Sequence, residues 1–237
     1  MTTTAPPAPA TSANAWLTRL HLNPASRAVQ RDLNNAAALH RRVMTLFPDG
    51  LGDSPRSRAG ALFRLDTVGS GALVLLVQSR VAPDTRRLPQ DYAEAQTKDM
   101  HTLLTALRPG LAVRYRLLAN AVRRCGRNST AGRWKQAIPL RGEEADRWWT
   151  ERATTAGLTP HTVLSEPSEP LTAWHLPDTA QTSTTDRVRV PHQATWFEGF
   201  ATVHDPDALR HALLHGIGRG KSYGCGLLSL APGTQNG

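Results

Sequence analysis

Cysteine is nearly absent from this chain of 237 residues, which contains only Cys125 and Cys225. Two cysteines supply neither a disulfide framework nor a zinc quartet, so a reduced, cytoplasmic compartment is the simplest expectation. No apolar run is long enough to cross a membrane, and no membrane partner is expected. Residues 1–14 lack the basic start and apolar centre of a signal peptide, and their Thr, Ala and Pro content predicts a disordered tail.

Patterns for metal-based or nucleophilic catalysis are also missing. The nine histidines show no metal-ligand spacing, and His211 and His215, four residues apart, have no evident third ligand. The carboxylates are spread over the chain and are not paired for two-metal chemistry. No Gly-x-Ser-x-Gly nucleophile elbow is present, because such an elbow follows a strand and opens a helix, whereas Gly220-Lys221-Ser222-Tyr223-Gly224 follows a predicted helix and precedes a predicted strand. We therefore expect no metal and no other cofactor, and a nuclease with this sequence should be metal-independent.

Lysine is scarce, and yet the chain is strongly basic, with a formal net charge of +9 and a pI near 10.7. Arginine carries nearly all of this charge, which favours a polyanionic partner such as nucleic acid. No acidic residue occurs between Met100 and Gly142, where nine basic residues are found: Arg108, Arg114, Arg116, Arg123, Arg124, Arg127, Arg133, Lys135 and Arg141. We predict that RNA is bound by part of this stretch, namely Arg123, Arg124, Arg127, Arg133 and Lys135. A solvated surface loop is the alternative interpretation.

The first half of the chain predicts the order strand, helix, strand, strand, weak helix, strand. Alternating residues 15–22 indicate the first strand, and apolar residues at helical spacing between Leu33 and Phe47 indicate one helix that begins near residue 27, with Ser26 as its cap. Residues 56–59 are predicted to form a loop. Strands are predicted at 61–68 and 72–79, joined by a Gly-Ser-Gly turn, and a weaker one near 97–104.

The second half repeats this order. Its strands are predicted at residues 113–118, 171–176, 194–203 and 225–230, and its helices at 143–156 and 207–215. We therefore predict an α+β protein of two tandem ferredoxin-like (RRM-like) domains, residues 15–109 and 110–237, joined at Arg108-Pro109-Gly110.

A glycine-rich segment, Gly216–Gly226, lies near the C-terminus and contains Arg219, Lys221 and Ser222. It follows a predicted helix and its glycine spacing differs from a Walker A loop, so nucleotide-phosphate motifs are excluded. A basic glycine-rich loop can approach an RNA backbone, dock another chain, or form a tight turn beneath a sheet. We predict RNA contacts by its three polar residues, and the alternatives stay open.

His40 is the strongest candidate for proton transfer. It is followed at once by Arg41 and Arg42, so an imidazole and two guanidinium groups share one predicted helical turn. Histidine titrates near neutrality, and arginines can hold a phosphate and stabilise developing charge. A surface histidine with no function is the alternative.

Two segments carry a family resemblance. Leu39-His40-Arg41-Arg42 to Pro48 resembles the first-helix segment of the CasE family, the CRISPR repeat-processing endoribonucleases of the type I-E Cascade system, and residues 216–232 resemble that family's C-terminal signature. Residues 15–22 and 115–120 are similar to its first strand and to the start of its second domain. The resemblance spans about residues 15–232.

The resemblance implies metal-independent cleavage of precursor crRNA at the base of the CRISPR repeat hairpin. The ribose 2′-hydroxyl attacks the adjacent phosphate, leaving a 2′,3′-cyclic phosphate and a 5′-hydroxyl, and the enzyme stays bound as a subunit beside other Cascade subunits. His40 corresponds to the catalytic histidine, whereas the family tyrosine three residues earlier is Ala37 here. Arg41, Tyr223 and Lys221 are candidates for its supporting role. The alternatives are a non-catalytic RNA-hairpin-binding subunit of the same fold and an assembly protein whose glycine-rich loop docks a partner.

Overall fold

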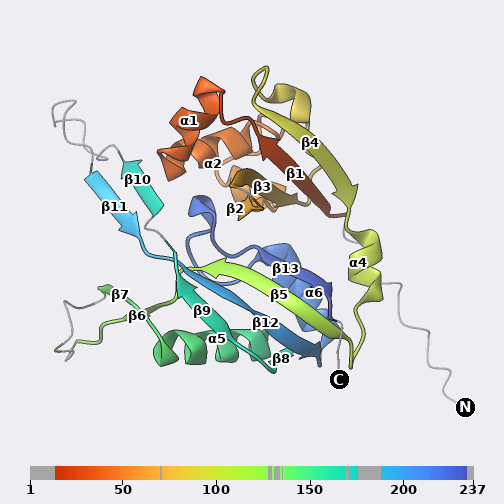
Figure 1. Ribbon diagram of the computed structural model, residues 1–237, viewed down its shortest axis with the longest axis vertical. Coiled ribbons are helices and arrows are strands. Elements are labelled where there is room, and N and C mark those ends of the chain that lie inside the picture. The colour runs from red at the N-terminus through yellow and green to blue at the C-terminus, as the bar shows by residue number, and fades with distance from the viewer. Residues whose placement is uncertain are drawn as a thin grey trace, which may run out of the picture.

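The computed structural model describes residues 14–69, 71–127, 130, 134, 136–168, 171–175 and 188–233. The predicted disordered tail, apart from Asn14, lies outside these residues. The described chain forms two α+β domains, one above the other in Figure 1, which confirms the predicted tandem ferredoxin-like fold. No helix in these ranges is long and apolar enough to span a membrane.

The N-terminal domain contains an antiparallel sheet with the strand order β2-β3-β1-β4. Read from the other edge, this is the order 4-1-3-2 that a strand-helix-strand-strand-helix-strand chain forms. Its strands are β1 (Trp16–Leu22), β2 (Leu62–Val68), β3 (Ala72–Ser79) and β4 (Ala93–Asp99). Its helices are α1 (Arg27–Leu33), α2 (Ala36–Met44), α3 (Pro55–Ala59) and the 3-10 helix η1 (Thr85–Arg87). β1 buries Thr18, Leu20 and Leu22 on one face, in keeping with the alternation of its sequence.

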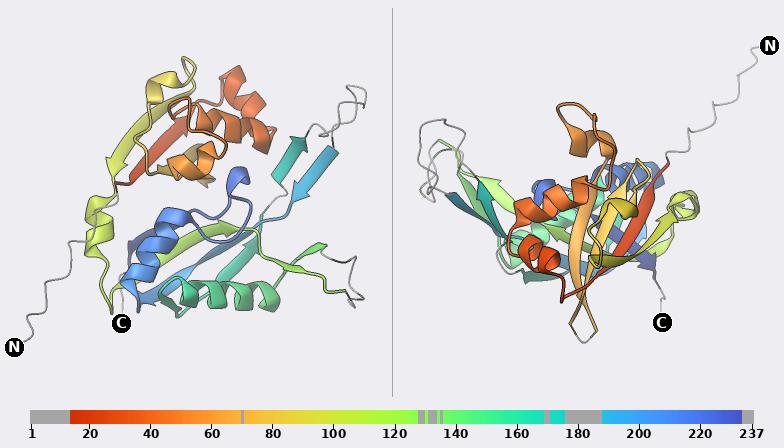
Figure 2. Two further views of the ribbon diagram at one scale, coloured as in Figure 1. Left: turned by 180° about the vertical axis from the view of Figure 1, so that it is seen from behind. Right: turned by 90° about the horizontal axis from the view of Figure 1, so that it is seen from above.

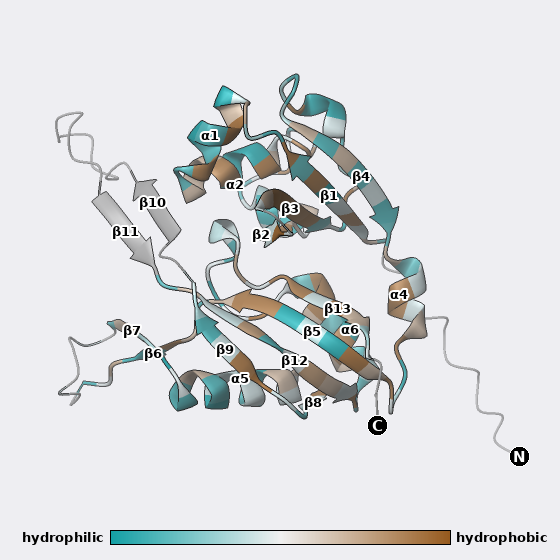
Figure 3. Cartoon of the chain, in the orientation of Figure 1, coloured by the Kyte–Doolittle hydropathy of each residue, from teal (hydrophilic) through white to brown (hydrophobic). Residues whose placement is uncertain are grey.

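Three predictions for this domain were wrong. The single helix is divided into α1 and α2, because Asn35 caps α2 by accepting a hydrogen bond from the Ala37 backbone N–H at 3.0 Å, and the Ser26 side chain makes no capping bond. The predicted loop at residues 56–59 is helix α3, with Pro55 in its first turn. The last strand ends at Asp99, and the apolar residues placed in it belong to α4 (His101–Ala106). The exposed strand β4, mostly hydrophilic in Figure 3, has no apolar alternation to reveal it.

The C-terminal domain repeats the arrangement with a sheet ordered β13-β5-β12-β8, to which β9 adds along β12. Its strands are β5 (Ala112–Ala119), β8 (Leu158–Pro160), β9 (Leu164–Pro167), β12 (Thr195–Val203) and β13 (Leu228–Pro232). Helices α5 (Glu143–Thr155) and α6 (Pro206–His215) cover it. Trp149 of α5 is fully buried against Tyr115 and Phe197, which anchors this helix to the sheet.

The predicted strand at residues 171–176 was assigned to the wrong sheet. β10 (Leu171–His175) pairs with β11 (Val188–His192) in a separate ribbon, and the second strand of the main sheet is divided into the short β8 and β9. A second ribbon, β6 (Val122–Arg124) with β7 (Ala137–Pro139), projects from the domain in Figure 1. The last strand begins three residues later than predicted. Each segment is too short for a periodic pattern.

Polar side chains of the N-terminal sheet bind backbone carbonyls of the C-terminal domain. Arg64 of β2, 1% exposed, donates to the carbonyls of Arg116 at 3.1 Å and Leu227 at 2.9 Å. The Gln78 amide donates to the Leu213 carbonyl at 2.5 Å. These contacts fix the two domains relative to each other. The predicted boundary at residues 109 and 110 lies between α4 and β5 and stays a prediction.

Candidate active site

Helix α2 places His40 at the contact between the two domains. Leu39 and Val43 bury one side of the helix in the N-terminal core, and the His40 ring stacks over Phe63 of β2 with a centroid distance of 6.1 Å. Within the described structure, the buried Nδ1 atom of His40 has no hydrogen-bond partner. Burial, followed by the positive charges of Arg56 and Arg41, lowers the pKa of His40. The ring is therefore neutral at pH 7 and able to accept a proton.

Two half-buried cations, Arg56 and Lys221, accompany His40. Arg56 lies on α3 and donates to the Ala61 carbonyl at 3.2 Å, and burial lowers its pKa. Lys221 lies on the 3-10 helix η2 (Lys221–Tyr223), which packs against α2, and burial together with Arg56 lowers its pKa. In the described part of the chain, neither residue, nor Arg41, has a carboxylate oxygen within 4.0 Å. Uncompensated, partly desolvated positive charge beside a neutral imidazole favours a bound anion.

The glycine-rich segment positions Lys221 by packing inside the molecule. A Cβ atom on Gly226, whose φ is +90°, would lie 2.7 Å from the Ile217 carbonyl oxygen, so this close approach requires glycine. A Cβ on Gly224 would be 3.5 Å from the Phe63 ring, on which the His40 ring stacks. In Figure 1 the blue segment at η2 reaches from the C-terminal domain toward α2, and Figure 2 shows the same approach from behind. The loop thus supports the helix that bears His40.

The two arginines that follow His40 face different surroundings. Arg41 is exposed. Arg42 pairs with the buried Asp32 through Nε at 2.8 Å and lies over the Tyr92 ring at 5.1 Å from the centroid. Arg42 is thus engaged with its own domain, whereas the Arg41 guanidinium is available to a ligand.

Two of the other predicted RNA-binding residues, Arg123 and Arg124, lie on the ribbon of β6 and β7, which is apart from α2 in Figure 1. On β6, Arg123 pairs with Glu144 at 3.3 Å, and Arg127 lies over the exposed Trp134 ring at 5.3 Å. Arg133 and Lys135 lie outside the described residues. In the glycine-rich segment, Arg219 is exposed and Ser222 is half-buried.

The position of the family tyrosine is occupied by Ala37, in the first turn of α2. Tyr223 of η2 is a nearby phenol, because η2 packs against α2. Burial raises the pKa of Tyr223, so its hydroxyl keeps its proton at neutral pH and can donate a hydrogen bond.

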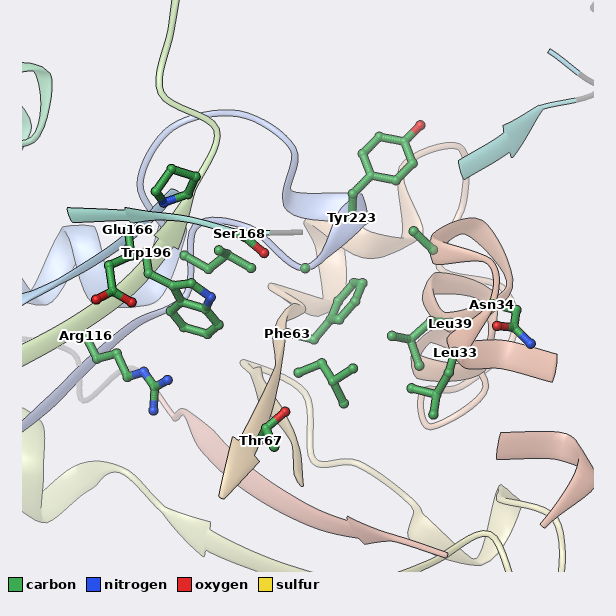
Figure 4. Close-up of a pocket in the computed structure, with 15 residues that line it drawn as sticks. Leu33, Asn34, Leu39, Phe63, Thr67, Arg116, Glu166, Ser168, Trp196 and Tyr223 are labelled. Carbon is green, nitrogen blue, oxygen red and sulfur yellow. The ribbon is translucent and has the colours of Figure 1, made fainter. Parts of the chain in front are cut away.

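An open groove of about 640 Å³ separates the domains next to Phe63. Figure 4 shows Phe63, Leu39 and Tyr223 on one side of it and Trp196 and Arg116 on the other. The Arg116 guanidinium lies 4.4 Å from the centroid of the Trp196 ring and so fixes that side of the groove.

Sequence reasoning missed Arg56, because the segment around it was predicted to be a loop. Proline at the start and Gly60 at the end, which adopts φ +62°, are the available signals for a short helix here. Across the described residues, no three His, Cys, Asp or Glu side chains cluster as a metal site.

Comparison with known proteins identifies relatives along nearly the whole chain. The profile of the family described as CRISPR associated protein matches residues 15–232. The CRISPR-associated endoribonuclease Cse3 of Thermus thermophilus is 34% identical over 92% of this chain and 100% of the relative. The CRISPR system Cascade subunit CasE of Escherichia coli is 28% identical over 87% of this chain and 96% of the relative.

A solved structure of CRISPR endoribonuclease Cse3 bound to a 19-nucleotide RNA has the same fold. It superposes with a TM-score of 0.76 at 30% sequence identity, covering 92% of this chain and 100% of that chain. The two domains, the helix bearing His40 and the glycine-rich loop all lie within the matched span. The chain therefore belongs to the CRISPR-associated protein family, as a member of its Cse3/CasE endoribonucleases.

Proposed function

We propose that this protein is an endoribonuclease that binds the CRISPR repeat hairpin and cleaves precursor crRNA at the base of the stem. The observation that carries the proposal is a neutral His40 that feels the charges of Arg41 and Arg56, with Lys221 on the 3-10 helix that packs against α2. None of the three cations is paired with a carboxylate in the described structure. The endoribonuclease name of a relative that matches over 92% of the chain supports the assignment to RNA cleavage.

The chemistry requires a proton acceptor and positive charge, both of which this site supplies. His40 accepts the proton of the ribose 2′-hydroxyl as its oxygen attacks the adjacent phosphorus. The bond from phosphorus to the 5′-oxygen then breaks, which leaves a 2′,3′-cyclic phosphate on one product and a 5′-hydroxyl on the other. Arg41, Arg56 and Lys221 stabilise the negative charge that accumulates on the phosphoryl oxygens.

The leaving 5′-oxygen must gain a proton. Tyr223 and Lys221 are the protonated groups that η2 brings to α2, and either one takes over the supporting role of the tyrosine that Ala37 replaces. The reaction needs no metal in this scheme, because the charges and the proton acceptor all come from the chain.

The remaining basic residues are assigned to the RNA outside the scissile linkage. Arg123, Arg124 and Arg127, on and beside the projecting ribbon, contact the backbone of the hairpin stem, which proteins read mainly through phosphates and shape. We assign Arg133, Lys135, Arg219 and Ser222 to the same RNA on charge and sequence alone. Arg42 contributes to the active site indirectly, because its ion pair with Asp32 helps to hold helix α2, which bears His40, in place.

After cleavage the protein remains on the hairpin as a subunit of the Cascade complex, as the name of the Escherichia coli relative suggests. Its place of action is then the cytoplasm, where the precursor transcript is made. The rival function is a non-catalytic subunit that binds the hairpin, and the alanine at position 37 is the observation that favours it.

The test is incubation of the purified protein with its own repeat hairpin RNA in EDTA, with wild type beside His40→Ala. Wild type should cleave the RNA at a single position. His40→Ala should lower the cleavage rate about 10²–10⁴-fold, the usual contribution of general acid–base catalysis. Hairpin affinity should change by only a few fold, because a neutral ring is removed. Binding without cleavage by wild type would support the non-catalytic rival.

A further inference from the structure

A second basic pocket lies beside the candidate active site, and it adds Arg80, which has no role in the scheme above, to Arg56 and Lys221. This pocket, of about 130 Å³, is lined by three cationic side chains, Arg56, Arg80 and Lys221, together with His215 at the end of α6. No carboxylate lines it, and its three cations form no ion pair within 4.0 Å in the described ranges. Since a water molecule takes up roughly 30 Å³, the space is large enough for a small anionic group.

The Arg80 side chain is already held in position. Its Nη2 donates to the Ser57 carbonyl at 3.0 Å. It passes over Gly60, where a Cβ atom would lie 2.6 Å from Arg80 Nε, so glycine is required for the guanidinium to occupy this place. Gly60 also ends α3 with a left-handed φ of +62°. A cation fixed in this way loses little conformational entropy when it binds an anion.

The pocket and His40 lie on opposite faces of the same edge strand. His40 stacks over Phe63, whereas the pocket is lined by the preceding residue, Leu62, and successive side chains of a strand point to opposite faces. β2 is the outer strand of its sheet. Arg56 belongs to both sites, because it lines the pocket and its charge acts on His40.

We propose that this pocket binds a second phosphate of the RNA strand, one next to the scissile linkage, and so holds the strand across the edge of β2. The inference rests on the proposed endoribonuclease function. A phosphodiester fits the pocket because guanidinium groups bind phosphate through directed, charge-assisted hydrogen bonds. Holding both sides of the scissile linkage would align the 2′-oxygen with the phosphorus.

The first test compares cleavage by the full-length variants Arg80→Gln and Arg58→Gln. Arg58 is an exposed residue of α3 that does not line the pocket, so its loss controls for net charge. Arg80→Gln should lower kcat/KM about tenfold, the effect of losing one hydrogen bond to a charged group, by raising KM and, because alignment is lost, by lowering kcat. Arg58→Gln should change it less than about twofold, and Arg80→Lys should recover only part of the loss, because lysine keeps the positive charge without the directed hydrogen bonds of a guanidinium. Equal effects of Arg80→Gln and Arg58→Gln would overturn the proposal.

The second test changes the RNA. Methylphosphonate, which is neutral, replaces one phosphate at a time on each side of the scissile linkage. At one position the substitution should slow wild type about tenfold and have almost no further effect on Arg80→Gln, since the two changes remove the same contact. If the losses multiply at every position, the pocket does not bind the RNA phosphate.

The reactions are run in buffer free of phosphate and sulfate and are repeated with added inorganic phosphate. Inorganic phosphate should compete with the RNA and slow cleavage by wild type, and this inhibition should be absent in Arg80→Gln. If inorganic phosphate instead changes the rate equally for every substrate, including the neutral ones, the pocket binds a free anion and the proposal is wrong. Absence of cleavage by wild type would refute the proposed function itself, a result distinct from either failure of the pocket.

Discussion

The buried Arg64 side chain should be one of the largest single contributors to stability in this protein. Its Nε and Nη2 donate to the two carboxylate oxygens of Asp66 at 2.7 and 3.0 Å. Its Nη1 donates to two carbonyls of the other domain, those of Arg116 and Leu227. The Arg64→Ala substitution would remove all four hydrogen bonds at once and leave Asp66, itself 6% exposed, without its partner.

The cost can be worked from these contacts. Removing one partner of a buried ion pair costs about 3–5 kcal/mol. Each carbonyl left unsatisfied adds about 1–3 kcal/mol, unless water enters the space that the side chain vacates. Because such terms are not additive, we expect about 4–6 kcal/mol in total. At roughly 2–4 °C per kcal/mol for a chain of this size, the melting temperature should fall by about 10–20 °C.

Urea unfolding of the RNA-free protein measures this cost, with Arg42→Ala as the matched control. Arg42 also pairs with a buried aspartate, Asp32, but the Tyr92 hydroxyl at 3.1 Å still satisfies that carboxylate and the pair lies within one domain. Arg42→Ala should therefore cost about 1–2 kcal/mol. A cost for Arg64→Ala below about 1.5 kcal/mol, or no larger than that of the control, would refute the reasoning.

Three further predictions concern the active site, the glycine-rich loop and the RNA. Arg56→Gln removes a positive charge that lowers the pKa of His40, so the acid limb of kcat/KM against pH should move to higher pH; an unchanged limb would mean that Arg56 does not act on the imidazole. Gly226→Ala should destabilise the protein by about 1–3 kcal/mol in thermal unfolding, because the residue has φ +90° and a carbonyl 2.7 Å from the new methyl group; wild-type stability would contradict the observed packing. Arg124→Gln should reduce the slope of log affinity against log salt by about one unit with no change in the cleavage rate constant at saturating RNA, and an unaltered slope would exclude a phosphate contact there.

Strong periodic patterns made the domain architecture predictable. The alternation in β1 and the two apolar strands around the Gly-Ser-Gly turn correspond to β1, β2 and β3, with boundaries within one residue. These elements bury large apolar side chains, which is why their sequences carry the pattern. His40 and Lys221 were also identified from sequence, His40 through the two arginines that follow it and through the family resemblance.

The missed features lack a local sequence pattern, for two different reasons. Strand β4 is exposed along nearly its whole length, so its sequence contains no apolar alternation. Arg56 and Arg80 are separated by 24 residues and meet only because α3 precedes β2 and Arg80 follows β3. No local pattern specifies such a meeting, and the basic pocket became evident only from the structure.

The most direct test of the central account is the identity of the product ends, measured with wild-type protein, EDTA and a repeat hairpin that carries a single 2′-deoxy nucleotide at the cleavage position. The account predicts that the all-ribose RNA yields a 2′,3′-cyclic phosphate and a 5′-hydroxyl, and that the 2′-deoxy RNA is bound equally well and not cut. Cleavage of the 2′-deoxy RNA at the same position, or products with a 5′-phosphate, would contradict attack by the 2′-oxygen and the role of His40.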